Sequence, residues 1–376
     1  MIYLDNAATT PLDPQVYAAM EPFFKSHFGN PSSIHSHGRE VRSAIEKSRK
    51  GIAQLLNAAP SEIFFTSGGT EADNTAIQCS IHAFNIKYAI TSRIEHHAVL
   101  HCLEALVKKG TIEISYVELE VDGSINIESL ETLLQQHPGA FVSLMHANNE
   151  LGNLSDIGAI AELCIKYGSV YHTDTVQTMG HYKHNVQNVK ADFLVGSAHK
   201  FHGPKGVGFL YAAGRKKIMP LLIGGAQERN MRGGTENVYG IIGLSTALEI
   251  AYQKMDEHHT YIQDLKSFMI GELNEAIPDV KFNGNIDPSS SLYTVLNVSL
   301  PQSDNNDMLL FNLDIKKVSA SGGSACSSGS DAGSHVLNAI NANHARGNVR
   351  FSFSKYNTKE EIVEVVKVLA GFFPKI

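Results

Sequence analysis

One lysine stands at the centre of the residues that could do chemistry in this chain. Lys200 follows an apolar run at residues 193–195 and precedes a Gly-Pro-Lys-Gly turn and a second β-prone run at residues 207–211. This order predicts a strand, a loop carrying the lysine, and a strand, so a rigid scaffold presents the amine. A lysine confined beside other positive charge loses its proton more easily and can attack a carbonyl to form an imine. A solvated loop lysine is the alternative interpretation.

A turn that could hold an anion follows another predicted strand. The tetrapeptide Ser-Gly-Gly-Thr at residues 67–70 comes directly after the strand predicted at residues 63–66 and opens a helix. Glycines let backbone N–H groups approach an anion, and the helix N-terminus adds partial positive charge, so a phosphate would fit here. The sequence has neither the dinucleotide-binding nor the P-loop pattern. An ordinary helix N-cap is the alternative.

Three further polar clusters, at residues 95–97, 148–150 and 172–177, follow predicted strands. His96 and His97 lack a third metal ligand at a recognisable spacing, so an imidazole stacked on a flat cofactor ring is the competing use. Asp174 ends its strand where an α/β sheet displays site residues. A buried carboxylate needs a positive partner, and a protonated pyridine nitrogen would serve. Pyridine ring, phosphate and lysine together indicate pyridoxal phosphate.

Composition excludes several other classes of protein. The chain has 376 residues, of which 43% are hydrophobic and 18% charged, which indicates an ordinary globular protein of two domains. A net charge of -7 gives no electrostatic footprint for nucleic acid, and no apolar run is long enough to span a membrane. The opening Met-Ile-Tyr-Leu-Asp is typical of a strand rather than a signal peptide. Four cysteines without a CxxC pair favour a reducing cytoplasm.

The elements expected to position these clusters alternate between strands and helices. The pattern predicts an N-terminal strand at residues 3–5 and helices at 14–28 and 39–56. It then predicts strands at 63–66, 88–91, 112–117, 140–145 and 170–173, separated by helices at 71–78, 98–108, 127–136 and 157–167. This alternation favours a mainly parallel sheet between helices, with the site at the strand ends. After a helix at 238–254 the regularity loosens into a smaller α+β region. Its last helix begins with a capping box, Thr358 to Glu361.

Ten stretches carry a resemblance to NifS/IscS-like (group I) cysteine desulfurases, which belong to the class V aminotransferase family of fold-type I pyridoxal-phosphate enzymes. They are YLDNAATTP, FGNPSS, FTSGGTEADN, EHHAVL, HANNELG, HTDTVQTMG, SAHKFHGPKGVG, MRGGTEN, SGGSACSS and VRFSFS. The stretches follow the family's order and spacing over nearly the whole chain. The resemblance implies an α/β fold of PLP-dependent transferase fold type I, in which a large domain holds a mainly parallel seven-stranded sheet between helices. The expected divisions are an N-terminal arm at 1–15 contributing to the small domain, the large cofactor-binding domain at 16–255 and a small α+β C-terminal domain at 256–376.

The resemblance also assigns roles to individual residues. Lys200 would hold the cofactor as an imine and later move the substrate's proton, Asp174 would stabilise the pyridinium, and His96 would stack on the ring. Arg350 would bind the substrate carboxylate as a bidentate fork, beside Asn149. The expected cofactor-binding residues are Gly69, Thr70, His96, Asn149, Asp174, Gln177, Ser197, His199, Lys200 and Thr235. Thr235 resembles the residue that reaches the phosphate of the neighbouring subunit, which implies a homodimer with shared sites.

The cysteines indicate which reaction the resemblance implies. Cys79, Cys102 and Cys164 lie in helical patterns and are expected to be buried. Cys326 lies in a glycine- and serine-rich stretch at residues 319–334, which predicts an accessible thiol. As in a cysteine desulfurase, Cys326 would take the sulfur of L-cysteine as a persulfide and leave L-alanine, with His96 a candidate to handle the thiol proton. A protein scaffold or sulfurtransferase would then accept the sulfur for iron–sulfur cluster biogenesis or another pathway.

Two alternatives stay open at this stage. A class V aminotransferase or another pyridoxal-phosphate lyase would use the same pocket without Cys326. A catalytically silent homologue would bind a partner or handle sulfur instead, although intact Lys200, Asp174, His96 and Cys326 argue against it. No metal is expected at the site.

Overall fold

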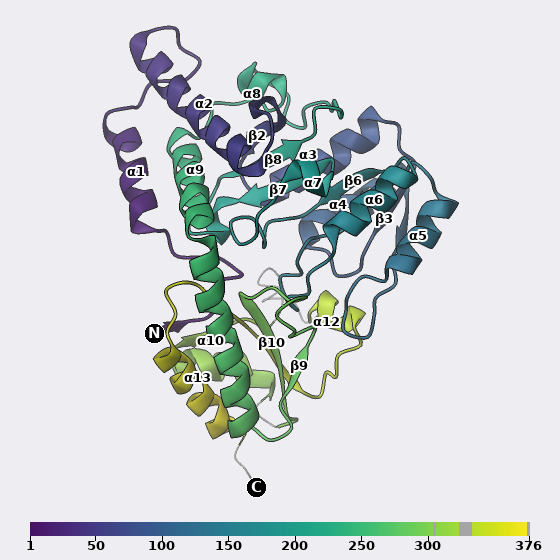
Figure 1. The fold of residues 1–376 in the computed structure, drawn as a ribbon, viewed down its shortest axis with the longest axis vertical. Helices are drawn as coiled ribbons and strands as arrows, with labels where there is room; N and C mark the ends of the chain where they lie inside the picture. The colour runs from purple at the N-terminus through teal and green to yellow at the C-terminus, as the bar shows by residue number, and fades with distance from the viewer. Residues whose placement is uncertain (304–305, 323–332, 374–376) are drawn as a thin grey trace.

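A seven-stranded sheet organises the upper part of the computed structural model, which describes residues 1–303, 306–322 and 333–373 (Figure 1). The strand order is β2-β8-β7-β6-β5-β3-β4. Within this sheet only β8 runs antiparallel to its neighbours, so the other six strands end at one common edge. The strands are β2 (Ile63–Thr66), β3 (Tyr88–Thr91), β4 (Glu113–Tyr116), β5 (Phe141–Ser143), β6 (Val170–Thr173), β7 (Phe193–Ser197) and β8 (Gly208–Ala212). The predicted fold class, a mainly parallel seven-stranded sheet between helices, is confirmed.

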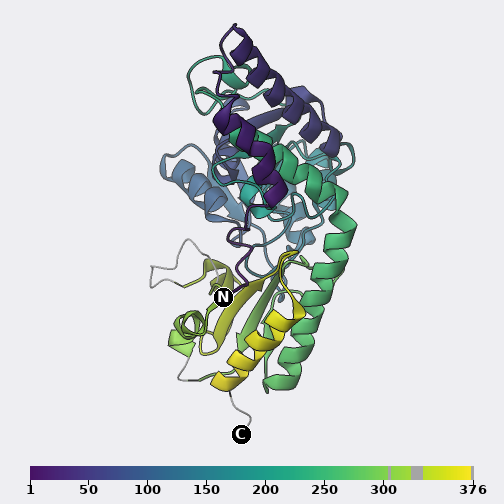
Figure 2. The same ribbon diagram turned by 90° about the vertical axis from the view of Figure 1, so that its left-hand side faces the viewer.

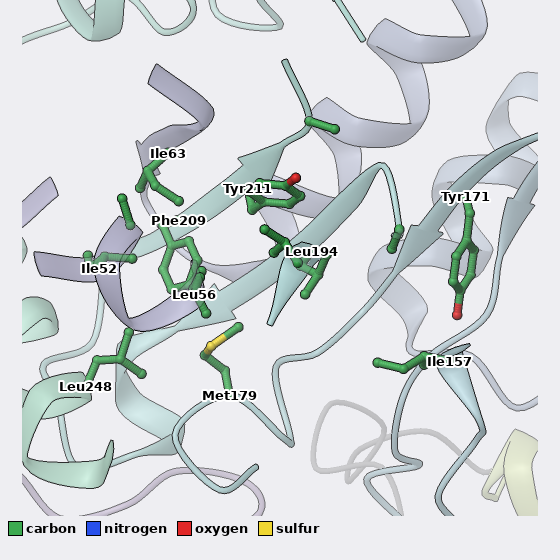
Figure 3. Packing of buried hydrophobic residues seen from close by; sticks show 14 of the residues in the cluster. Ile52, Leu56, Ile63, Ile157, Tyr171, Met179, Leu194, Phe209, Tyr211 and Leu248 are labelled. Carbon is green, nitrogen blue, oxygen red and sulfur yellow. The ribbon is translucent and has the colours of Figure 1, made fainter. Parts of the chain in front are cut away.

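Helices cover both faces of this sheet, and the side chains of the strands alternate between the two helical layers. On β8, Phe209 and Tyr211 pack into one hydrophobic cluster and Leu210 into another, as the two-residue period of a strand requires. Figure 3 shows Phe209 among side chains of α2. The first layer comprises α2 (Ser36–Leu56), α5 (Ile127–Gln136), α6 (Ile157–Lys166) and α9 (Val238–Gln253), and the second comprises α3 (Gly69–Ala83) and α4 (His97–Lys108).

A separate hydrophobic cluster forms the core of the lower part of the molecule. There β9 (Lys281–Asn283), β10 (Val295–Leu300) and β12 (Gly347–Ser352) form an antiparallel sheet, against which α10 (Met255–Ala276) and α13 (Lys359–Phe372) pack. The N-terminus joins this part, because β1 (Ile2–Tyr3) pairs in parallel with β11 (Val318–Ser319). Figure 2 shows the N-terminus in the lower part. The remaining helices are α1 (Pro14–Lys25), α7 (Val186–Val189), α8 (Gln227–Asn230), α11 (Leu309–Ile315) and α12 (His335–Ala339), with short 3-10 turns at Pro60–Glu62, Ala198–Lys200 and Asn306–Met308.

The sequence pattern predicts a smaller α+β region after residue 254, without naming its first helix. This region begins with α10, which follows α9 with only Lys254 between them, and the pair runs from the upper into the lower part (Figure 1). The apolar stripe of α10, at Ile262, Leu265, Met269 and Leu273, is buried at the three- and four-residue spacing of a helix. The predicted domain boundary near residue 255 therefore falls inside a helical pair, and the division into two domains stays a prediction.

The other elements lie close to their predicted positions. The first helix ends at Lys25 rather than at residue 28, and α3 is longer than predicted because it continues to Ala83. The capping box of α13 is confirmed, since Thr358 accepts from the Glu361 N–H while the Glu361 carboxylate accepts from the Thr358 N–H.

Candidate active site

The strand ends and the N-terminal segment enclose a cavity of about 240 Å³ at the carboxyl edge of the large sheet. Ten of the predicted site residues line this one cavity: Gly69, Thr70, His96, Asn149, Asp174, Gln177, Ser197, His199, Lys200 and Arg350. They come from segments up to 281 positions apart, from residue 69 to residue 350. The fold therefore gathers polar groups that the sequence presents separately.

One end of the cavity is built to receive an anion. Helix α3 begins at Gly69, and its N-cap is Gly68, which has no side chain to accept hydrogen bonds from the first turn. A β-carbon on Gly208 of β8 would lie 2.8 Å from the Cα of Gly68, so only a glycine lets the two backbones approach this closely. Thr70, and Ser197 at the end of β7, complete this wall. The exposed dipole of a 15-residue helix and these hydroxyls fit a phosphate.

Lys200 ends the 3-10 turn that follows β7, as the predicted strand and loop require. Its Nζ donates to the carbonyl oxygens of Ala7 at 2.5 Å and Ala8 at 3.0 Å. Gln177 donates to the same Ala7 carbonyl at 3.1 Å. The N-terminal segment thus holds the amine beside the cavity through backbone groups that no side-chain motif reveals.

Asp174 follows β6 directly and is buried at the floor of the cavity. Its Oδ1 accepts from the Val176 N–H at 2.8 Å. Burial raises the pKa of this carboxyl, while the Val176 N–H and the charge of Lys200 act in the opposite direction. A carboxylate in this environment favours a cationic ring nitrogen as its partner.

Two histidines of the cavity are neutral at physiological pH. Burial, reinforced by the charge of Lys200, lowers the pKa of His96 to about 4 and that of His199 to about 4. His96 is the N-cap of α4, and its Nδ1 accepts from the Ala98 N–H at 3.1 Å, which leaves the proton on Nε2. His199 Nδ1 lies 3.2 Å from the Thr9 hydroxyl. The ring of His96 can therefore stack on a flat group as a neutral imidazole.

The guanidinium of Arg350 reaches the cavity from β12 of the lower part. Its Nη1 donates to the Asn149 carbonyl at 2.9 Å and its Nη2 to Asp5 Oδ1 at 2.7 Å. Its Nε finds no hydrogen-bond acceptor within the described parts of the chain, although the side chain is only 1% exposed. A buried guanidinium with an unused N–H is suited to a carboxylate ligand.

One predicted site residue of the described ranges does not line this cavity. Thr235 is exposed on the loop between α8 and α9 and does not line it. The base of its loop is tied to the anion-binding wall, because Arg232 donates to both carboxylate oxygens of Glu71, at 2.9 and 3.2 Å. Cys326 lies outside the described residues.

The other three cysteines are buried as predicted. Burial raises the pKa of Cys79 to about 11 and that of Cys102 to about 12, and it also raises the pKa of Cys164. These thiols are poor nucleophiles. Within the described ranges, no group of three or more histidine, cysteine, aspartate or glutamate side chains is arranged to hold a metal ion. Over the same ranges, no helix has the length and apolarity needed to cross a bilayer.

Several residues of the cavity were not predicted: Ala7, Ala8, Asp73, Met145 and Val176. Asp73 could have been found, because it lies three positions after Thr70 and so shares a face of α3 with it. Ala7 and Ala8 act through backbone oxygens, for which the sequence carries no side-chain signal. Asp5, which accepts a hydrogen bond from Arg350, was not predicted because 345 positions separate the two residues in the sequence.

The comparisons with known proteins agree with this geometry. A model of the family Aminotransferase class-V matches residues 2–365. The chain belongs to this family. Enzymes of the class V aminotransferase family depend on pyridoxal phosphate, which confirms the predicted cofactor. The N-terminus of α3, which lacks a side-chain cap, fits the phosphate of this cofactor. The buried Asp174 fits its ring nitrogen, and Lys200 fits its aldehyde.

This class V aminotransferase family member is also similar to named cysteine desulfurases. It is 45% identical to cysteine desulfurase IscS of Dictyoglomus turgidum, over 100% of this chain and 95% of that protein. It is 42% identical to the putative cysteine desulfurase IscS 1 of Bacillus subtilis, over 100% of this chain and 99% of that protein. A solved NifS-like protein superposes with a TM-score of 0.91 at 34% identity, covering 98% of both chains. The predicted resemblance to NifS/IscS-like enzymes is confirmed.

Proposed function

We propose that this protein is a cysteine desulfurase, which converts L-cysteine to L-alanine and takes the sulfur onto Cys326. The observation that carries the proposal is the convergence of ten predicted site residues on one cavity. Full-length similarity to cysteine desulfurases supports the same reaction. In this reaction the substrate C–S bond breaks and a bond forms between the substrate sulfur and Cys326 Sγ. The β-carbon keeps the electron pair of the broken bond and gains a proton, so the three-carbon product leaves as alanine.

The bound cofactor supplies an electron sink, and the residues of the chain bind, orient and move protons around it. The wall formed by Gly69, Thr70 and Ser197 would hold its phosphate, and His199 would add a donor there. Asp174 would pair with the ring nitrogen, and Gln177 would contact the phenolic oxygen. His96 would cover one face of the ring as a neutral imidazole.

Substrate binding would depend on Arg350. Its fork is already oriented by Asp5 and by the Asn149 carbonyl, and the unused Nε–H offers a donor to the α-carboxylate of cysteine. A preoriented side chain loses less entropy on binding. Asn149 would lie beside the substrate.

Lys200 would accept the substrate's α-proton, because its Nζ lies in the same cavity as Asp174 and Arg350. His96 has its Nε2 protonated while Nδ1 accepts from the Ala98 N–H. It can take the substrate thiol proton only after Nδ1 releases that hydrogen bond, or through an exchange in which Nε2 first gives up its own proton. His96 therefore stays a candidate for this step.

Three wider features belong to the same proposal. The exposed Thr235 is expected to reach the phosphate of a second copy, which makes the protein a homodimer with shared sites. Sulfur on Cys326 would pass to an acceptor protein for iron–sulfur cluster biogenesis or another sulfur pathway. A reducing cytoplasm suits this chemistry, because it keeps the accepting thiol free.

The test compares purified wild type with Cys326→Ser and with Cys79→Ser, a buried thiol that serves as the matched control. Each protein is mixed with L-cysteine, and alanine and reducible protein-bound sulfur are measured. Wild type and Cys79→Ser should form both products, while Cys326→Ser should retain its yellow cofactor and form neither. Equal alanine from all three proteins would contradict the proposal and identify a lyase or aminotransferase.

A further inference from the structure

A second buried carboxyl shares the floor of the cavity with Asp174, and the proposed function gives it no role. Asp73 lies on α3, is 1% exposed and lines the same cavity. Its Oδ1 lies 3.2 Å from Nε2 of His172, whose side chain is fully buried. Neither atom has another hydrogen-bond partner among the described residues, so each is the natural partner of the other.

The histidine of this pair is itself fixed by the sheet. His172 lies on β6 opposite Ser143 of β5, and its Nδ1 lies 2.9 Å from the Ser143 hydroxyl. Burial lowers the pKa of His172 to about 3, so the ring is a neutral imidazole with one N–H and one acceptor nitrogen. When Nδ1–H points to Ser143, Nε2 is left as an acceptor facing Asp73.

Three buried acids, Asp73, Glu95 and Asp174, act on one another electrostatically. Glu95 accepts from the Met145 N–H at 2.9 Å and from the Ser92 hydroxyl at 3.0 Å, and Asp174 accepts from the Val176 N–H. No lysine or arginine of the described ranges forms an ion pair with Asp73 or Glu95. Three neighbouring buried carboxyls cannot all be ionised, because each charge raises the cost of the next.

The pKa shifts of Asp73 and Glu95 both favour the protonated form of the carboxyl. Burial, followed by the charges of Asp174 and Glu95, raises the pKa of Asp73 well above its ordinary value. Burial raises the pKa of Glu95 to about 8. Asp73 also acts electrostatically on the Cys102 thiol of α4, whose pKa is raised to about 12, mainly by burial, and which is therefore neutral.

We propose that Asp73 is a protonated carboxylic acid that donates its hydrogen bond to Nε2 of His172, so that Asp174 alone presents a negative charge to the ring nitrogen of the cofactor. Asp73 is thus a positioning residue, acting through Asp174, and the inference rests on the proposed use of the pyridoxal-phosphate site. In this arrangement the proton of Asp73 lies in the hydrogen bond to His172. Asp174 consequently remains an ionised acceptor for the ring nitrogen. If Asp174 instead shared a proton with Asp73, it would be protonated part of the time and could not accept.

Infrared difference spectroscopy of the purified protein without cofactor tests the protonation directly. Wild type minus Asp73→Asn should show the carbonyl band of a protonated carboxylic acid at neutral pH. Glu95→Gln is the matched control, because it removes a different buried acid and should leave the Asp73 band in place. A difference spectrum showing carboxylate bands, with no protonated-acid band, would overturn the proposal.

A second readout uses the cofactor-loaded protein. Asparagine keeps a neutral donor facing His172, so Asp73→Asn should leave the pH midpoint of the cofactor's visible absorption and the affinity for pyridoxal phosphate close to wild type. Loss of a real negative charge would instead move that midpoint by about one pH unit or more, and this result would also overturn the proposal. If Asp73→Asn does not fold, His172→Gln replaces it. The glutamine carbonyl can still accept from Asp73, so the acid band should shift but persist, and an unshifted or missing band contradicts the assignment.

Neither readout involves L-cysteine. Absence of alanine formation would therefore count against the proposed desulfurase reaction, whereas the bands and the absorption midpoint report on Asp73 alone.

Discussion

Arg350 and Ser321 exchange both of their backbone hydrogen bonds, Arg350 N–H to Ser321 O at 2.6 Å and Ser321 N–H to Arg350 O at 3.2 Å. The residue that is expected to bind the substrate carboxylate is thus paired with the segment that leads toward Cys326. Ser334 follows Cys326 in the sequence, as Ser321 precedes it. The Ser334 hydroxyl donates to Glu150 Oε2 at 2.5 Å, and Glu150 is the neighbour of Asn149 in the chain. Both ends of this stretch are tied to residues around the proposed substrate site.

Asp5 should contribute to substrate binding without contacting the substrate. In Asp5→Asn the guanidinium of Arg350 loses its ionic partner, so the KM for L-cysteine should rise about tenfold, as for a charge-assisted hydrogen bond of about 1.5 kcal/mol. The absorption spectrum of the bound cofactor should stay unchanged, since Asp5 does not line the cavity. Steady-state kinetics measure the effect, and an unaltered KM would contradict it.

The buried ion pair of Arg49 and Glu228 should dominate the stability of the loop region before α9. Arg49 donates to both Glu228 oxygens at 2.7 Å, and both side chains are at most 2% exposed. Arg49→Met leaves a buried, unpaired carboxylate and should lower the free energy of unfolding in urea by about 3–5 kcal/mol. The exposed pair of Lys166 and Glu131 is the control, and Lys166→Met should leave the free energy of unfolding nearly unchanged because water screens this pair. Equal losses would contradict the expectation.

Glu95 should make stability depend on pH. Its pKa is about 8 in the folded state and ordinarily 4.5, so the folded state binds more protons than the unfolded state between these values. Below pH 4.5 Glu95 is protonated in both states and does not reduce the free energy of unfolding. As the pH rises from 4.5 toward 8, the unfolded state loses this proton first, so the free energy of unfolding falls. Glu95→Gln should remove this dependence. Urea midpoints of both proteins from pH 5 to 8.5 test it, and parallel curves would exclude the effect.

The close contact of β8 with the phosphate turn predicts a selective loss in Gly208→Ala. The new methyl group would meet Gly196 O at 2.5 Å and Gly68 Cα at 2.8 Å, so the turn must move. The affinity for pyridoxal phosphate should fall, and the free energy of unfolding should drop by about 1–3 kcal/mol. Gly271→Ala is the matched control, because no atom lies within 4 Å of its added methyl and an exposed helical alanine should stabilise by about 0.5–1 kcal/mol. Unchanged affinity in Gly208→Ala would refute the expected movement.

The sequence predicts most of the polar side chains that line this cavity. Lys200, Asp174, His96 and Arg350 follow strand ends or lie on a strand, and parallel strands bring such positions to one edge. It does not reveal Ala7 and Ala8, which act through carbonyl oxygens, or the pairing of Asp73 with His172, which depends on how α3 crosses the sheet. The sequence pattern does not single out α10 although its apolar residues have helical spacing, because the many polar residues between them weaken the apolar periodicity.

The placement of the N-terminus has a consequence for how the chain is made. Leu4 packs into the core of the lower part. Two hydrogen bonds join this segment to the far end of the chain: Arg350 donates to Asp5, 345 positions away, and the Ser352 hydroxyl donates to the Leu4 carbonyl, 348 positions away. During synthesis the first residues must therefore wait for almost the entire chain before they find their native neighbours. The upper sheet can assemble while translation continues. The lower core, and with it the oriented guanidinium, can be completed only after β12 has left the ribosome, so the protein should acquire its substrate site last.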